Sequence, residues 1–197
     1  MFFASTIEDE LTFVHCYPLY DSNLSKIIMD TAITKSLGLT LTQIAWVVKD
    51  IETTLSFFQE VLGIKFSKVD TIRVKEFGAT YYGEPSNAES LVAMAYSGGI
   101  FIELIQPVSG NSVFKDYLDK NPAGGIQHFA YSLPVDKLNK VISEFSDKGF
   151  PVISSFDHPI AKIVFFDTCK EIGIMTEIMG ITEEGEKAVE QMKNQTS

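Results

Sequence analysis

The chain has 197 residues, a formal net charge of −10 and 45% hydrophobic residues. This length suits one ordinary domain or two small modules that share a core. The acidic balance argues against a nucleic-acid partner, because no basic stripe is present to contact phosphates. Two cysteines, Cys16 and Cys169, are too few for a disulfide framework and favour a reducing, cytoplasmic compartment.

The N-terminus, "MFFASTIEDEL", has no basic stretch before its apolar residues and soon turns acidic. We therefore expect no signal peptide, no membrane-spanning segment and no membrane partner. Residues 1–38 have no counterpart in the rest of the chain. We interpret them as an N-terminal extension that covers an edge of the fold with a helix and a strand.

An internal repeat organises the middle of the chain. The stretches 42–66 and 127–152 each predict a strand, a polar break, an amphipathic helix, a glycine and a second strand. Gly63 and Gly149 lie where a helix C-cap favours glycine. The apolar positions of the two predicted helices match, and they are Leu55, Phe58, Leu62, Leu138, Val141, Ile142 and Phe145.

Each repeat ends in an apolar strand that carries one glutamate, "GIFIELI" at 99–105 and "GIMTEIM" at 173–179. The pattern predicts an α+β fold in which tandem β-α-β-β-β modules form one cupped mixed sheet with helices outside. The boundaries that we expect are about 40–107 and 124–180 for the modules, 39–180 for the domain, 112–120 for a joining helix and 181–197 for a polar, solvated C-terminal helix.

The two glutamates of these strands are placed on apolar faces. Side chains alternate along a strand, so Glu103 shares a face with Phe101 and Ile105, and Glu177 shares one with two methionines. An unpaired buried carboxylate is unfavourable, and such groups are normally paired, protonated or bound to a metal ion. The repetition of this feature therefore indicates a functional centre.

Two further polar residues occupy matching positions in the repeat. Gln43 opens the first strand of one module, and His128 opens that of the other. Together with Glu103 and Glu177 they offer oxygen and imidazole ligands, which suit a divalent ion such as Zn, Ni, Co, Mn or Fe. Taken singly, a strand His is more often a hydrogen-bonded core residue and a strand Glu a solvated one. The symmetry of the four positions favours the metal site.

These motifs resemble the vicinal oxygen chelate superfamily, which includes glyoxalase I, extradiol dioxygenases, methylmalonyl-CoA epimerase and bleomycin-resistance proteins. The resemblance runs from about Leu41 to Gly180 and is strongest to the epimerase branch. It is carried by "IAWVVKDIETTLSFFQEVLGIKF", "SGNSVFKDYLDKNPAGGIQH" and "VFFDTCKEIGIMTEIM". It implies that the metal ligands are Gln43, Glu103, His128 and Glu177.

The chain departs from the epimerase pattern at two positions. Epimerases usually have His where this chain has Gln43, and a second His where it has Gln127. The resulting set of one Gln, one His and two Glu resembles the zinc form of glyoxalase I, although the glutathione-binding arginines of that enzyme have no counterpart here. Extradiol dioxygenases use two His and one carboxylate, so Gln43 argues against that activity.

The epimerase resemblance implies a second catalytic acid on a preceding strand, and Glu89 lies near that place. The alternative interpretation is that Glu89 is a solvated carboxylate in a loop, without a catalytic role. Tyr81 and Tyr82 belong to a long aromatic loop that either closes over a ligand or packs as an ordinary loop. His158 lies near a loop that contacts substrate in epimerases.

We therefore expect a metal-dependent isomerase or epimerase that removes a proton α to a metal-bound carbonyl of an acyl thioester or small carboxylic acid. Glu177 is the first candidate for the base, with Glu103 or Glu89 on the opposite side. The alternatives are a glyoxalase I-type lactoylglutathione lyase and a non-catalytic protein that binds a small molecule. Retention of all four ligand types favours an enzyme, and we further expect a homodimer.

Overall fold

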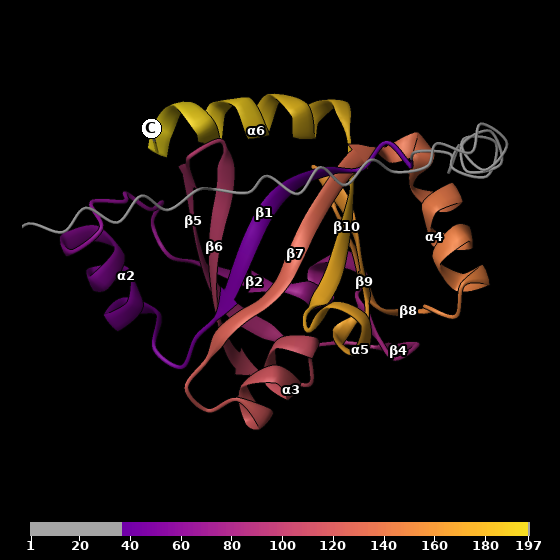
Figure 1. Cartoon of the computed structure of the whole chain (residues 1–197), viewed down its shortest axis with the longest axis horizontal. Coiled ribbons are helices and arrows are strands. Elements are labelled where there is room, and N and C mark those ends of the chain that lie inside the picture. The colour runs from indigo at the N-terminus through magenta and orange to yellow at the C-terminus, as the bar shows by residue number, and fades with distance from the viewer. Residues whose placement is uncertain (1–36, 197) are drawn as a thin grey trace, which may run out of the picture. The chain divides into compact units, whose positions relative to one another are not determined.

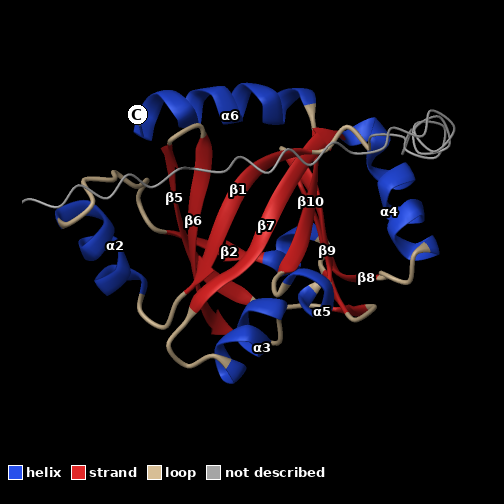
Figure 2. Ribbon diagram, in the orientation of Figure 1, coloured by secondary structure: helices blue, strands red, loops and turns tan. Residues whose placement is uncertain are grey.

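The structure, a computed structural model, describes residues 37–196 of the chain. Residues 1–36 of the predicted N-terminal extension, including Cys16, lie outside the described residues. Figure 1 shows the described part as strands with helices around them, and Figure 2 separates the two kinds of element by colour. No helix within residues 37–196 is long and apolar enough to cross a membrane.

Two modules of similar order follow one another along the chain. The first consists of β1 (Thr40–Val47), α2 (Ile51–Glu60), β2 (Asp70–Arg73), η1 (Val74–Phe77), β3 (Thr80–Tyr81), β4 (Glu84–Pro85), β5 (Glu89–Ser97) and β6 (Ile100–Ser109). The second consists of β7 (Gly125–Pro134), η2 (Val135–Lys137), α4 (Leu138–Asp147), β8 (Val152–His158), β9 (Ala161–Phe166), α5 (Cys169–Ile172) and β10 (Met175–Ile181). Helix α3 (Val113–Lys120) joins them, and α6 (Glu183–Thr196) follows the second.

The strands within residues 37–196 form one ten-stranded mixed sheet in the order β2-β5-β6-β1-β7-β10-β9-β8-β3-β4. The first strands of the modules, β1 and β7, pair antiparallel at its centre. Each of them also pairs in parallel with the last strand of its own module, β6 or β10. This pairing relates the modules by pseudo-symmetry and confirms the predicted α+β fold with one curled sheet and helices outside.

The predicted helices begin and end for local reasons. Asp50 caps α2 by accepting a hydrogen bond from the Thr53 backbone N–H at 2.9 Å. Gly63, after the helix, has a φ of +69°, a conformation that favours glycine. The prediction that Leu62 lies on the buried face of this helix is wrong, because α2 ends at Glu60 and Leu62 is 52% exposed.

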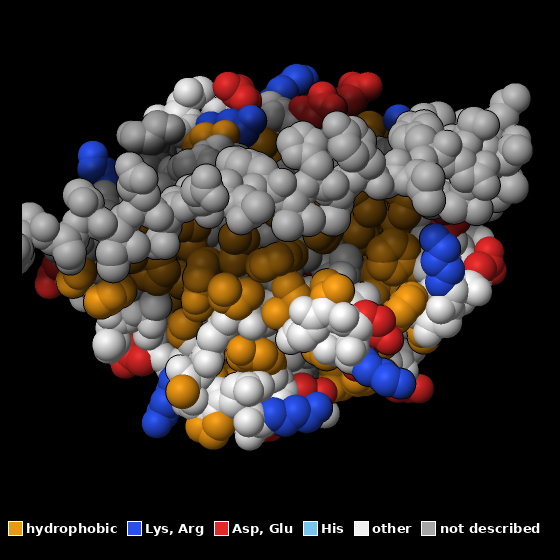
Figure 3. Space-filling model, viewed as in Figure 1, with side chains coloured by type: hydrophobic (Ala, Val, Ile, Leu, Met, Phe, Trp, Pro, Cys, Tyr) orange, Lys and Arg blue, Asp and Glu red, His pale blue; other side chains and the backbone are white. Residues whose placement is uncertain are grey.

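Helices α2 and α4 pack on the outer side of the sheet. Leu138 and Val141 of α4 are buried against Phe166 and Ile178 of β9 and β10. Figure 3 shows hydrophobic side chains gathered over the face between α2 and α4, and Phe57 of α2 is 53% exposed. Apolar surface of this kind often marks an interface, which agrees with a homodimer, although the dimer stays a prediction.

The loop between β2 and β5 is more ordered than an ordinary connection. Its hairpin β3–β4 belongs to the first module yet pairs with β8, an edge strand of the second. The Tyr81 hydroxyl donates a hydrogen bond to Asp116 of α3, and Tyr82 is 59% exposed with a φ of +48°. The described lining of the cavity below includes neither tyrosine, so the packing interpretation of this loop holds.

Candidate functional site

Four central strands position the predicted ligands. Ala45 of β1 pairs with Glu103 of β6 on one side and with His128 of β7 on the other. Glu177 of β10 pairs with Ala130 of β7. Both alanines are fully buried, and their short side chains leave space on the concave face. Residues far apart in sequence thus meet because the modules share the centre of one sheet.

The side chains of Glu103, His128 and Glu177 converge in the structure. One ligand atom from each lies within 4.8 Å of the other two. His128 Nε2 is 2.8 Å from Glu177 Oε2 and 3.8 Å from Glu103 Oε2. Atoms that bind zinc at about 2.1 Å must lie about 3 to 3.5 Å from one another, so this spacing fits a divalent ion after small movements.

The tautomer of His128 follows from its neighbour Gln127. Oε1 of Gln127 lies 2.6 Å from His128 Nδ1, and Nε2 of Gln127 donates to Met175 Sδ at 2.6 Å. An amide oxygen only accepts hydrogen bonds, so Nδ1 must carry the proton. In a neutral ring Nε2 then keeps its lone pair and is available as a ligand.

The contact between His128 Nε2 and Glu177 Oε2 is the strongest indication of a bound cation. Among the buried side-chain nitrogen and oxygen atoms of the described residues, only His128 Nε2 has no hydrogen-bond partner. Two lone-pair acceptors 2.8 Å apart repel each other unless a proton or a metal ion lies between them. A divalent ion would satisfy this geometry and offset the two carboxylates, so the residues present fit a metal site.

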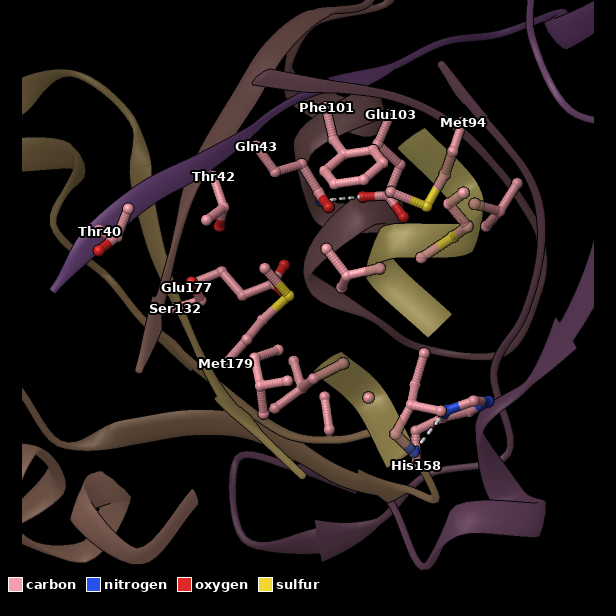
Figure 4. A pocket seen from close by; sticks show the side chains of 18 of the residues that line it. Thr40, Thr42, Gln43, Met94, Phe101, Glu103, Ser132, His158, Glu177 and Met179 are labelled. Carbon is pink, nitrogen blue, oxygen red and sulfur yellow. Dashed lines mark hydrogen bonds between the residues drawn. The ribbon is translucent and has the colours of Figure 1, made fainter. Parts of the chain in front are cut away.

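Glu103 and Gln43 complete the centre. Burial, and then the charge of Glu177, raises the pKa of the Glu103 carboxyl well above its usual range. Gln43 Nε2 donates to Glu103 Oε2 at 2.7 Å, which Figure 4 shows as the dashed line between these two labelled residues. Rotation of the Gln43 amide by 180° would instead place its oxygen at this position, where it could act as a fourth ligand.

The imidazole of His128 is held in place by two aromatic rings. Phe114 of α3 stacks on it with a centroid distance of 6.0 Å, and Phe165 of β9 meets it edge to face at 5.2 Å. The histidine side chain is completely buried. Its orientation is therefore determined by packing as well as by Gln127, as expected of a residue that holds an ion.

A cavity of about 640 Å³ opens beside the centre, a size typical of small-molecule sites. Glu103, Glu177 and Gln43 project into it, together with Met94, Phe101 and Met179, as Figure 4 shows. Other apolar side chains complete much of the described wall, and they include Ile72, Val92, Phe114, Phe156, Ile163 and Phe165. The cavity thus combines one polar corner with apolar sides.

The structure does not bring Glu89 to this cavity. It lies at the start of β5, opposite Ser109, and forms a 3.3 Å ion pair with Arg73. Position 94 of β5, a methionine, is the one opposite Glu103. His158 does line the cavity, and burial lowers the pKa of its imidazole.

Sequence reasoning missed the roles of Gln127 and of the C-terminal helix. Gln127 was noted as a departure from a family pattern, whereas the structure shows it as the hydrogen-bond partner of the candidate ligand. Val189 and Met192 of α6 line the cavity, although the tail reads as a solvated helix. Their spacing of three residues was the available signal, because such residues share a helix face.

Known proteins resemble the chain in sequence and in fold. The sequence model of the Glyoxalase/Bleomycin resistance protein/Dioxygenase superfamily matches residues 42–165. The mitochondrial methylmalonyl-CoA epimerase of Mus musculus is 28% identical over 114 residues, which cover 58% of this chain and 56% of that protein. The chain thus spans little more than half the length of such mammalian relatives.

Two bacterial proteins give similar results. The ethylmalonyl-CoA/methylmalonyl-CoA epimerase of Cereibacter sphaeroides is 26% identical over 125 residues, covering 61% of this chain and 84% of that protein. The crystal structure of methylmalonyl-CoA epimerase from Mycobacterium tuberculosis matches with a TM-score of 0.54 and 17% identity, covering 76% of this chain and 91% of that one. The structural likeness concerns the fold.

Proposed function

The chain belongs to the glyoxalase/bleomycin resistance protein/dioxygenase superfamily, and from this premise we propose that it is a metal-dependent isomerase or epimerase. The reaction is the transfer of a proton at the carbon next to a carbonyl group. The proposal depends most on the convergence of Glu103, His128 and Glu177, of which the two glutamates line a cavity. A protein that only binds an apolar molecule has no need of three converging ligand groups, two of them buried.

The substrate class that we propose is an acyl-CoA thioester, or a small carboxylic acid of similar shape. The relatives named as methylmalonyl-CoA epimerases support a thioester. The cavity, at about 640 Å³, suits the acyl part of such a molecule, with the nucleotide outside. Apolar walls exclude water from the reacting carbon, and the polar corner orients the oxygen atoms.

The residues of the site have different roles in the proposed reaction. A divalent ion bound by Gln43, Glu103, His128 and Glu177 would polarise the substrate carbonyl and so acidify the neighbouring carbon. Glu177 projects into the cavity, is 4% exposed and acts as the base that removes the proton. Glu103, the other carboxylate at the polar corner, is the group that can return a proton to the carbon.

Exchange of the substrate proton with solvent tests this proposal. We would incubate the full chain with Zn²⁺, Co²⁺ or Ni²⁺ in D₂O with branched acyl-CoAs, 2-oxo acids and methylglyoxal–thiol adducts, and follow deuterium incorporation by NMR. Glu177→Gln keeps an oxygen ligand but lacks a base. It should lower the exchange rate by about 10²- to 10⁴-fold, the usual contribution of one proton-transfer group.

The matched control is Glu171→Gln, because Glu171 is an exposed glutamate of α5 that is not among the cavity residues. This variant should exchange at the wild-type rate. Equal exchange in wild type and Glu177→Gln would remove Glu177 from the mechanism. No exchange with any member of the panel would count against proton transfer and favour a binding protein.

A specific observation supports one alternative, glyoxalase-type isomerisation of a hemithioacetal. Glu89, the candidate second acid, forms an exposed ion pair with Arg73 and is not among the described residues that line the cavity. The two carboxylates at the polar corner, Glu103 and Glu177, both belong to the candidate metal set. A reaction in which one base both removes the proton and returns it to the substrate needs no second acid. Exchange with methylglyoxal–thiol adducts, but with no acyl-CoA, would favour this alternative.

A further inference from the structure

The first turn of α6 is fixed against the turn between β8 and β9. Thr182 donates its backbone N–H to the Ile160 carbonyl and its hydroxyl to the Pro159 carbonyl, both at 3.1 Å. Gly185 fits directly against Ile160, because a Cβ at this position would lie 2.0 Å from the Ile160 oxygen. The helix therefore begins at one defined place beside the cavity.

The last turns of α6 reach the other module. Nζ of Lys193 lies 5.7 Å from the centre of the Tyr96 ring on β5. Helix α6 thus runs from the β8–β9 turn of one module to the β5–β6 hairpin of the other, across the ends of the central strands (Figure 1). It closes that end of the cavity, whose lining includes residues of this helix.

Of the α6 residues in the described cavity lining, Val189 and Met192 are the half-buried apolar ones, whereas Glu186 and Glu190 are exposed. Gln191, between Val189 and Met192 in sequence, is exposed and is not part of the described lining. The lining also includes Met94, Met179 and Ile181. Methionine side chains adapt to different apolar shapes. Lys193 is the one Lys or Arg of the described lining, and it lies within 3.4 Å of Glu190, so an anionic group is not favoured there.

We propose that α6 is the specificity element of this site. Val189 and Met192 form an end wall that limits the length of an apolar alkyl or aryl substituent on the substrate. This inference rests on the proposed function, which places the oxygen-bearing end of the substrate at Glu103, His128 and Glu177. The family match ends at residue 165, before α6 begins, so the limit is set by a part of the chain outside the matched region.

Binding of a homologous series tests the proposal without turnover. We would titrate the Zn²⁺-loaded full chain with straight-chain 2-oxo acids of increasing length by calorimetry. Each added methylene should tighten binding about fourfold until the chain reaches α6, after which the gain should stop. Val189→Trp should move this limit to shorter acids and weaken the longest ones on the order of tenfold. Val189→Ala should move it to longer acids.

The matched control is Gln191→Trp, which adds the same bulk to the exposed side of the same helix. It should leave the length limit unchanged, and Zn²⁺ affinity should be the same in all variants. The proposal would be overturned if binding affinity depended on acid length in the same way in wild type, Val189→Trp and Val189→Ala. So would binding that shows no dependence on chain length.

The outcome is separable from that of the exchange experiment. A length limit that responds to position 189, in a protein that exchanges no proton, would support α6 as the specificity element and refute the enzymatic function. Proton exchange with no response at position 189 would support the function and refute the role of α6.

Discussion

Gln127 determines, at the residue scale, which nitrogen of His128 faces the cluster. Its carbonyl oxygen accepts from Nδ1, and both side chains are buried. Gln127→Leu keeps the volume but removes the acceptor, so the affinity for Zn²⁺ should fall by about 10- to 100-fold. Gln127→Glu keeps an acceptor oxygen, so its affinity for Zn²⁺ should fall much less. Competition with a chromophoric chelator measures both constants, and equal affinity in wild type and Gln127→Leu would contradict this role.

The raised pKa of Glu103 makes a second prediction, for the metal-free protein. Burial, and then the charge of Glu177, favours the protonated form in the folded state. The associated stability is therefore present below about pH 4.5, the pKa of the unfolded chain, and is lost as the pH rises through the raised folded value.

The variant Glu103→Gln lacks this titration. In the presence of a chelator, its free energy of unfolding relative to wild type should rise as the pH increases from about 4.5 to 8. Zn²⁺ should reduce this difference in the free energy of unfolding between Glu103→Gln and wild type, because the ion stabilises the ionised carboxylate of Glu103. Urea unfolding at a series of pH values measures this effect. Parallel pH profiles for the two proteins, without metal, would show that Glu103 does not titrate abnormally.

At the scale of elements, the β3–β4 hairpin connects the modules away from the sheet centre. It pairs with β8, and the Tyr81 hydroxyl donates to Asp116 on α3. Burial and the Asp116 carboxylate both raise the pKa of Tyr81, so the phenol stays protonated as a donor. Tyr81→Phe should lower the free energy of unfolding by about 1.5 to 3 kcal/mol, the usual contribution of a hydrogen bond to a charged group.

Tyr82→Phe is the control for this prediction, because Tyr82 is 59% exposed. The change should alter stability by less than about 0.5 kcal/mol. Chemical unfolding of both variants gives the comparison. If Tyr81→Phe were as stable as Tyr82→Phe, the hydrogen bond to Asp116 would contribute nothing to the attachment of the hairpin.

The elements that could be predicted from the sequence are those with strong local patterns. The repeated helices have apolar periodicity and a following glycine, and Gly149 indeed has a φ of +89°. The docking of β3–β4 on β8 could not be predicted, because two-residue strands have no periodicity and their partner lies more than 70 residues away. The apolar contribution of α6 to the cavity comes from Val189 and Met192, which stand in an otherwise polar segment and give a weak pattern.

At the scale of the whole described domain, the candidate site belongs to neither module alone. Glu103 comes from the first module, and His128 and Glu177 come from the second. The repeat predicted their meeting, because equivalent positions in a pseudo-symmetric pair converge at the shared strands. Glu89 shows the limit of this reasoning. Its place depends on the hairpin register, which sets Met94 rather than Glu89 opposite Glu103.

Metal stoichiometry tests the central claim most directly, because every step of the proposed chemistry needs an ion at this centre. We would purify the full chain without chelators and titrate it with Zn²⁺, Co²⁺ and Ni²⁺ at neutral pH under native mass spectrometry. The convergence of Glu103, His128 and Glu177 predicts one tightly bound ion per chain in wild type. His128→Ala should lose it, whereas His158→Ala, which alters the cavity but not the cluster, should keep it. A wild-type chain that binds no ion, or a His128→Ala chain that binds it equally well, would contradict the account.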